Sequence, residues 1–97
     1  MTVLLYHWTR EQDVEAILRE GFRDTCYTKP CGVHLSDDPA ANYPGGRDDV
    51  LLVVEIPDAI DVLPWLNPEQ ICGYRDFIVR AEVVNGCATV RRHEQLG

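Results

Sequence analysis

Two histidines and an aspartate occupy strand-like runs of this chain. His7 ends a short apolar run, His34 lies in a short run that follows a glycine, and Asp76 begins a run that alternates polar and apolar residues. A hydrophobic core has little use for such groups, because burying a polar or charged side chain without a partner costs free energy. An imidazole can exchange a proton near neutral pH, and a carboxylate can stabilise developing positive charge. We therefore predict that His7, His34 and Asp76 line one cleft.

Length and composition place the chain in the class of small globular proteins. It has 97 residues, 45% hydrophobic and 26% charged, which predicts a single domain over residues 1–97. The net charge of −7 argues against a general polyanion binder, because affinity for a phosphate backbone comes from clustered Lys and Arg. No stretch approaches the roughly 20 apolar residues of a membrane helix, and the N-terminus lacks the pattern of a secretory signal. A cytoplasmic protein without a membrane partner is expected.

The four cysteines leave two interpretations open. Without a secretory signal, Cys26, Cys31, Cys72 and Cys87 are expected to be reduced, and we predict buried free thiols. Alternatively, Cys26 and Cys31 could form a metal cluster with His34. Their spacing fits no common zinc pattern, so no metal site is predicted.

The first part of the chain predicts a strand, a helix and a second strand. Residues 3–7 are apolar almost throughout, which is typical of a central strand. Thr9 and Gln12 form a capping box, so Thr9 is expected to cap a helix that follows it. Gly21 is expected to end it, with Phe22 packing back. The apolar stripe of the helix consists of Val14, Ile17 and Leu18.

The rest of the chain predicts more strands than helices. Asp38 and Pro39 supply an N-cap and a first helical residue for a short helix. The expected elements are a loop at 23–31, a strand at 33–36, the short helix at 39–43, a flap at 44–49, a buried strand at 50–56, a loop with one helical turn at 57–73, a strand at 76–84, a turn at 85–86 and a strand at 88–92. Glu55 lies in the buried strand and needs a partner there, for which Arg10 or Arg47 is expected.

Six segments, in this order, resemble the catalytic core of poly(ADP-ribose) polymerase-type ADP-ribosyltransferases. Residues 7–9, His-Trp-Thr, are similar to the family's His-Gly-Ser or His-Gly-Thr, and residues 16–22, ending in Gly-Phe, to its Ile-Leu-x-x-Gly-Leu/Phe. Residues 32–37, Gly-Val-His-Leu-Ser-Asp, are similar to Gly-Ile-Tyr-Phe-Ala-Asp, and residues 40–43 to Ser-Ala-Asn-Tyr. Residues 51–56 resemble Leu-Leu-x-x-Glu-Val, and residues 74–79 resemble Tyr-x-Glu-Tyr-Ile-Val, which bears the catalytic glutamate.

This resemblance implies an α+β fold of the ADP-ribosyltransferase type, a split β-sandwich of two small sheets with flanking helices. It implies that NAD is the substrate, either for mono-ADP-ribosyl transfer or for NAD glycohydrolysis. His7 would hydrogen-bond the ribose of the adenosine half, and His34 and Tyr43 would enclose the nicotinamide ring. Asp76 would stabilise the positive charge that develops on the ribose carbon as nicotinamide leaves. Arg10 or Arg47 could bind the pyrophosphate.

Three positions depart from the family pattern. Trp8 replaces a glycine whose backbone faces the nicotinamide carboxamide, a contact that survives if the indole points away. Ala40 replaces a serine, for which Ser36 or Thr9 could substitute as the carboxamide ligand. Asp76 replaces glutamate and shortens the acid by one methylene, and a misplacement near 1 Å can cost about a hundredfold in rate.

Other interpretations stand beside this one. His34 lies in a segment that is also similar to the His-Val-His-Leu-Ser of RNA 2′-phosphotransferases, which use NAD too, although Arg47 is the one good match to their arginine set. A non-catalytic scaffold that binds a nucleotide or a partner protein is a further alternative. His7 could be a core histidine, and Asp76 could form a surface ion pair with Arg75 or Arg80. The acceptor, protein or nucleic acid, is not specified, and an inhibitory partner protein would suit a small toxin-like enzyme.

Overall fold

A computed structural model describes residues 2–25, 31–40, 45–46, 48–67 and 75–93. The elements follow one another as β1 (Thr2–Arg10), α1 (Glu11–Glu20), β2 (Val33–Ser36), β3 (Asp49–Pro57), the 3₁₀ turn η1 (Leu63–Trp65), β4 (Asp76–Val79), α2 (Ala81–Cys87) and β5 (Thr89–Arg92). The protein is therefore an α+β domain, as the sequence predicted.

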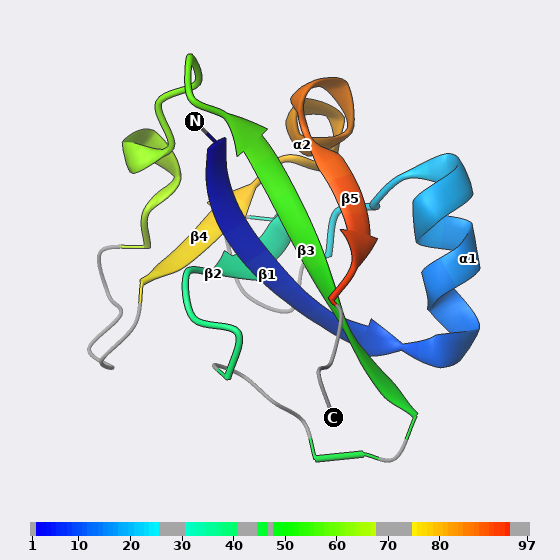
Figure 1. The fold of residues 1–97 in the computed structure, drawn as a ribbon. Helices are drawn as coiled ribbons and strands as arrows, with labels where there is room; N and C mark the ends of the chain where they lie inside the picture. Colours follow the sequence, from blue (N-terminus) through cyan, green and yellow to red (C-terminus); the bar gives the residue numbers. More distant parts are fainter. Residues whose placement is uncertain (1, 26–30, 41–44, 47, 68–74, 94–97) are drawn as a thin grey trace.

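The five described strands form one antiparallel sheet in the order β4-β2-β1-β3-β5 (Figure 1). β1 and β3 are paired along their whole length, from Thr2 opposite Pro57 to Arg10 opposite Asp49. β1 and β2, in contrast, are joined only at Tyr6 opposite Ser36. The prediction of two separate sheets is thus wrong in the described part of the chain, because this one pair joins the halves β4-β2 and β1-β3-β5.

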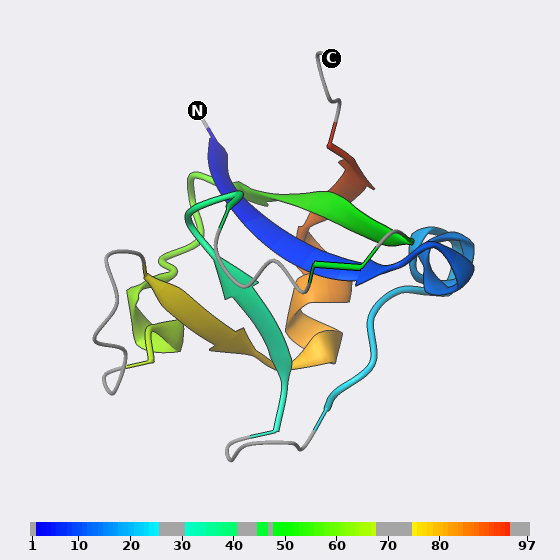
Figure 2. The same ribbon diagram turned by 90° about the horizontal axis from the view of Figure 1, so that it is seen from below.

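The core fills the space between the two halves of the sheet. Figure 2 shows β2 and β4 turning away from β1 and β3, with α2 beside the space between them. Side chains on one face of each strand point into this space, since alternate residues of a strand face opposite sides. The largest fully buried side chains are Leu5, Val14, Leu35, Leu52, Val53, Val54, Ile56, Val79 and Val84.

The junction between β1 and α1 differs from the prediction. Thr9 lies inside β1 opposite Val50, and the helix begins at Glu11, one residue later than a cap at Thr9 predicts. The N-cap is Arg10, which makes no side-chain capping bond. Pairing with β3 continues to Arg10, and the Glu11 N–H donates to the Asp48 carbonyl at 2.7 Å. Tertiary pairing therefore overrides the Thr9 capping box.

The end of α1 is as predicted. The Gly21 N–H donates to the Ile17 carbonyl at 2.8 Å, and Gly21 has a φ of +91°. Glycine adopts this conformation without the steric penalty that a Cβ brings. Phe22 follows and is buried in the core.

The predicted strand at 76–84 is half right. β4 ends at Val79, and residues 81–87 form α2, so the turn predicted at 85–86 and the second half of the strand are wrong. Ala81 and Val84 are the buried residues of α2, and their spacing of three places both on one face of a helix, whereas in a strand they would face opposite sides. A carboxylate from another segment, Asp24, accepts the Ala81 N–H at 2.7 Å and fixes the start of the helix.

β1 is three residues longer at its end than the strand predicted at 3–7, whereas the remaining strands agree with the prediction within a residue. β2 has the predicted bounds, β3 is one residue longer at each end, and β5 begins one residue later. η1 is the helical turn expected within the loop at 57–73, of which residues 57–67 are described. Pro39 and Ala40 lie in a turn, and the rest of the short helix predicted at 39–43 lies outside the described residues.

Candidate functional site

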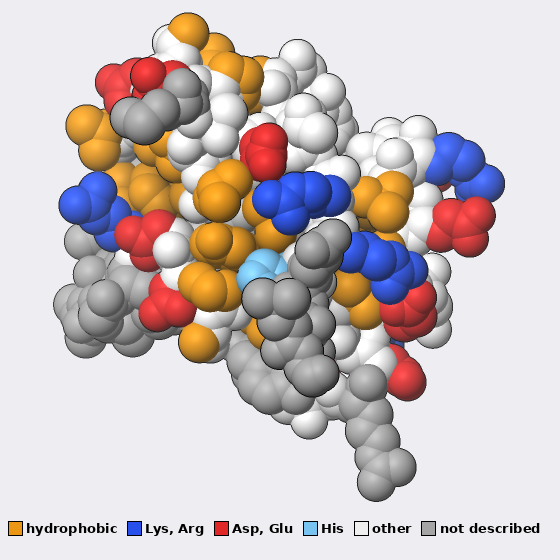
Figure 3. All heavy atoms as spheres, in the orientation of Figure 1, with side chains coloured by type: hydrophobic (Ala, Val, Ile, Leu, Met, Phe, Trp, Pro, Cys, Tyr) orange, Lys and Arg blue, Asp and Glu red, His pale blue; other side chains and the backbone are white. Residues whose placement is uncertain are grey.

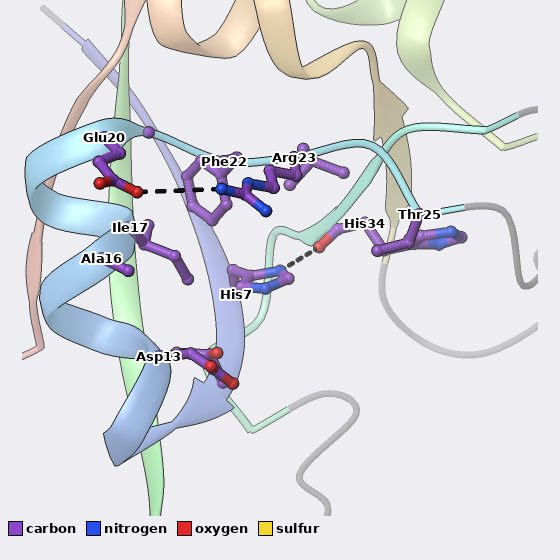
Figure 4. Close-up of a pocket in the computed structure, with 12 residues that line it drawn as sticks. His7, Asp13, Ala16, Ile17, Glu20, Phe22, Arg23, Thr25 and His34 are labelled. Carbon is purple, nitrogen blue, oxygen red and sulfur yellow. Dashed lines mark hydrogen bonds and ion pairs between the residues drawn. The ribbon is translucent and has the colours of Figure 1, made fainter.

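A pocket opens where β1 and β2 separate. Beyond the Tyr6–Ser36 pair, β1 continues along β3 and β2 continues along β4, so the two strands no longer bond to each other. A cavity of about 370 Å³ lies at this separation and against α1 (Figure 4). We call it the notch pocket. It is lined by His7, Thr9, Asp13, Ala16, Ile17, Glu20, Gly21, Phe22, Arg23, Thr25, Val33 and His34.

His7 is the best-defined polar group of the notch pocket. Its Nδ1 lies 2.8 Å from the carbonyl oxygen of His34. A carbonyl only accepts, so Nδ1 carries the proton and Nε2 of the neutral ring is an acceptor. Burial lowers the pKa of His7, an effect that the bond to His34 partly opposes. The pocket therefore contains a neutral imidazole whose Nε2 makes no hydrogen bond to a described residue.

The ring of Phe22 fixes the orientation of this imidazole. The two ring centroids are 5.1 Å apart and the planes meet at 82°, an edge-to-face contact. Phe22 is one of the apolar groups of the pocket wall, together with Ile17 on α1 and Val33 on β2. The wall thus combines an apolar surface and one oriented polar ring with the charged side chains of Asp13, Glu20 and Arg23.

His34 contacts His7 through its backbone carbonyl and not through its imidazole. Its carbonyl holds His7, while Figure 4 shows its imidazole directed away from His7. In β2, His34 shares a face with Ser36, two residues on, and therefore with Asp76, which is paired with Ser36. His7 points to the core face of β1 with Leu5. The structure therefore joins His7 to the backbone of His34 by a hydrogen bond, whereas Asp76 only shares a face of the sheet with the His34 side chain.

Asp76 is buried, with 8% of its surface exposed. Its Oδ2 accepts a long hydrogen bond of 3.4 Å from the Asn67 amide, and its buried Oδ1 accepts none from the described residues. The alternative of a surface ion pair is wrong, because Asp76 is not exposed and Arg80 lies 3.8 Å from Asp24 instead. Asp76 does not line the notch pocket. It lies opposite Ser36, at the end where β1 and β2 meet.

The other predicted ligands are divided between the two faces of the strands. Thr9 lines the notch pocket, whereas Trp8 does not, since its side chain alternates to the face opposite His7. Ser36 is buried, and its hydroxyl donates to the Asp38 carbonyl at 2.9 Å. Ser36 and Thr9 were the two candidates for the carboxamide ligand, and of these only Thr9 lines the pocket. Tyr43 and Arg47 lie outside the described residues.

Sequence reasoning missed the contribution of α1. Asp13, Ala16, Ile17 and Glu20 line the pocket, and their spacing of three and four residues is that of one helix face. Arg23 follows the helix and lies 4.0 Å from Glu20. The predicted apolar stripe is only partly right, because Val14 is buried in the core whereas Leu18 is exposed and Ile17 lines the pocket.

The partner of Glu55 also differs from the prediction. Its carboxylate pairs with Arg91 on β5 at 3.2 Å, rather than with Arg10, and Arg47 is not described. Figure 3 shows this outer face of the sheet, with basic side chains beside apolar ones. On the same edge, both guanidinium nitrogens of Arg92 bond to Glu11, at 2.9 and 2.7 Å. These arginines are therefore engaged in ion pairs away from the notch pocket.

The cysteines are not all reduced. Cys31 is disulfide-bonded, which contradicts the prediction of free thiols, while Cys87 is free and half-buried. A disulfide sulfur is not a thiolate ligand, so the metal cluster of Cys26, Cys31 and His34 loses a ligand. Among the described residues there is no group of three His, Cys, Asp or Glu that could hold a metal ion. The predicted cytoplasmic location assumed reduced thiols, and the disulfide of Cys31 does not support it. The location stays a prediction.

Comparison of the chain with protein-family models, with curated proteins and with solved structures found no match. None of the described helices is long and apolar enough to cross a membrane.

Proposed function

We propose that the protein is an NAD-dependent ADP-ribosyltransferase-like enzyme, which transfers ADP-ribose to an acceptor or to water. The observation that carries the proposal is the notch pocket, which opens between β1 and β2 and contains the neutral imidazole of His7. The ordered motifs of the sequence supply the same histidine, and the pocket lies where the two halves of the single sheet separate.

His7 and Thr9 are the polar contacts for a nucleoside in the notch pocket. The acceptor at His7 Nε2 matches a ribose hydroxyl, which can donate to it. The Thr9 hydroxyl can bond a carboxamide, and the apolar wall formed by Phe22 and Val33 suits a planar ring. A volume of about 370 Å³ is small for a ligand pocket, so the pocket takes one half of the dinucleotide.

Asp76 supplies the charge for the reaction. The bond between the ribose C1′ and the nicotinamide nitrogen breaks, and nicotinamide leaves with the bonding electron pair. The acceptor or water then attacks C1′ and releases a proton. The positive charge that develops on the ribose is stabilised by the carboxylate of Asp76, whose Oδ1 accepts no hydrogen bond from the described residues. This role requires the ribose to extend from the pocket toward the Tyr6–Ser36 pair, beside which the buried Asp76 lies.

Calorimetric titration with NAD, followed by chromatography for released nicotinamide, tests the proposal. NAD is expected to bind the wild-type protein and to release nicotinamide, and His7→Gln is expected to weaken binding. His93→Gln is the matched control, since His93 packs on Tyr6 and does not line the pocket. Binding without release would make the protein a nucleotide-binding scaffold, and loss of a 2′-phosphate from added RNA would make it a phosphotransferase. No binding at millimolar NAD would refute the proposed function.

A further inference from the structure

Asn85 on α2 holds the segment that forms one wall of the notch pocket. Its Oδ1 accepts the N–H of Phe22 at 2.8 Å, and its Nδ2 donates to the carbonyl of Phe22 at 2.9 Å. One side-chain amide thus satisfies both backbone groups of a buried residue that lies outside any strand. Without such a partner, each of these groups would carry a desolvation cost.

The glycine before Phe22 makes this close approach possible. A Cβ added at Gly21 would lie 2.7 Å from Cγ and from Oδ1 of Asn85, closer than real contacts allow. The same glycine ends α1 at a positive φ. Gly21 therefore serves two purposes, the end of the helix and the room for the Asn85 amide.

A second contact connects α2 to the same segment. One carboxylate oxygen of Asp24, Oδ1, accepts the N–H of Ala81 at 2.7 Å, and the other lies 3.8 Å from Nε of Arg80. The segment from Phe22 to Asp24 is thus attached to the first turn of α2 and to Asn85 one turn later. Gly21, Phe22, Arg23 and Thr25 all line the notch pocket.

We propose that Asn85 is a positioning residue for this site, which acts through Phe22 on the imidazole of His7. The amide fixes the backbone of Phe22, and the ring of Phe22 packs edge-to-face on His7. Loss of the amide lets the wall move away, so that water reaches the imidazole. The effect on ligand affinity rests on the proposed function, whereas the effect on His7 does not.

The protonation of His7, followed by NMR with labelled histidine, reports on this wall. Burial lowers the pKa of His7, and release of the wall is expected to raise it toward its usual value. The other charged or titratable groups that line the pocket are Asp13 and Glu20 from α1, Arg23 from the connecting segment and His34 from β2. A neutral substitution at Asn85 changes none of these groups, so a change in the pKa of His7 indicates that the wall formed by Phe22 has moved.

The experiment compares Asn85→Ala with Glu82→Gln, an exposed position on the same helix. In Asn85→Ala the pKa of His7 is expected to rise, and the Kd for NAD is expected to increase on the order of tenfold, the size of one oriented hydrogen bond. Glu82→Gln is expected to change neither. Failure of the wild-type protein to bind NAD would refute the proposed function and leave the His7 measurement intact.

A purely structural role for Asn85 predicts a different result. Asn85→Ala would then lower the stability while the titration of His7 stays as in the wild-type protein, and this outcome overturns the proposal. If Asn85→Ala does not fold, Asn85→Ser and Phe22→Leu take its place, since the first shortens the side chain without adding a charge and the second removes only the ring. An unchanged His7 titration in either folded variant also overturns it.

Discussion

The Nδ1 atom of His7 lies 2.8 Å from the carbonyl oxygen of His34, and this bond joins the two halves of the sheet beside the notch pocket. It places the proton of the neutral imidazole on Nδ1 and leaves Nε2 as an acceptor. It also gives His7 a partner within the protein, so that part of its role is structural. The chemical role proposed for His7 belongs to the other nitrogen, Nε2, and can be tested separately.

The stability of the protein is expected to fall as the pH is lowered from about 7 to 5, in part because of His7. Burial holds the pKa of folded His7 below its usual value of 6.5, so the unfolded chain binds the proton first. This contribution is complete above pH 6.5 and is lost as the pH falls through the folded pKa. Urea unfolding at a series of pH values is expected to show a shallower decline in His7→Gln. An equal decline in both proteins would show that His7 does not carry this effect.

Thr9→Val separates a pocket role for Thr9 from the helix-capping role that the sequence suggested. Thr9 lies within β1 and makes no capping bond, so the free energy of unfolding is expected to change by less than about 0.5 kcal/mol. The Kd for NAD is expected to rise, because the hydroxyl of the pocket is lost. A loss of about 1 kcal/mol in stability, as for a removed N-cap, with unchanged affinity would contradict this assignment.

Gly21→Ala is expected to destabilise the fold by roughly 1–3 kcal/mol, because it strains a positive φ and brings a methyl group against Asn85. Chemical denaturation of Gly21→Ala, Asn85→Ala and the double variant measures both causes. The double variant is expected to be more stable than the sum of the single effects predicts, since removing the Asn85 amide relieves the contact. Simple additivity would show that the backbone strain alone accounts for the loss.

The strands and the notch histidine could be predicted from the sequence, but the connections between elements could not. The apolar runs that became β1, β2 and β3 are strong local signals. The start of α1 was misplaced because Thr9 is held by β3, a tertiary contact that no local pattern contains. The strand predicted through Val84 became α2, because Asp24 and Phe22, about 60 residues away, supply the partners of Ala81 and Asn85.

The candidate site shows the same division. The sequence pointed to His7, His34 and Asp76, and the structure relates them through a backbone carbonyl and the pairing of β2 with β4. The sequence does not show which nitrogen of His7 can accept a hydrogen bond, because this depends on where β2 lies relative to β1. It also does not show that α1 forms one side of the pocket, because this depends on how the helix packs. The packing of separate elements against one another is not determined by residue types and spacing alone.

Nicotinamide release by Asp76→Asn, measured beside the affinity for NAD, decides whether the Asp76 carboxylate takes part in the reaction. The substitution keeps the size of the side chain and removes its charge, which matters most in the transition state. Turnover is expected to fall by at least about a hundredfold while the Kd stays within a few-fold, and Asp76→Glu, which restores the acid of the resembled family, is expected to keep or raise the rate. Full turnover in a folded Asp76→Asn protein would contradict the claim that this carboxylate stabilises the ribosyl cation.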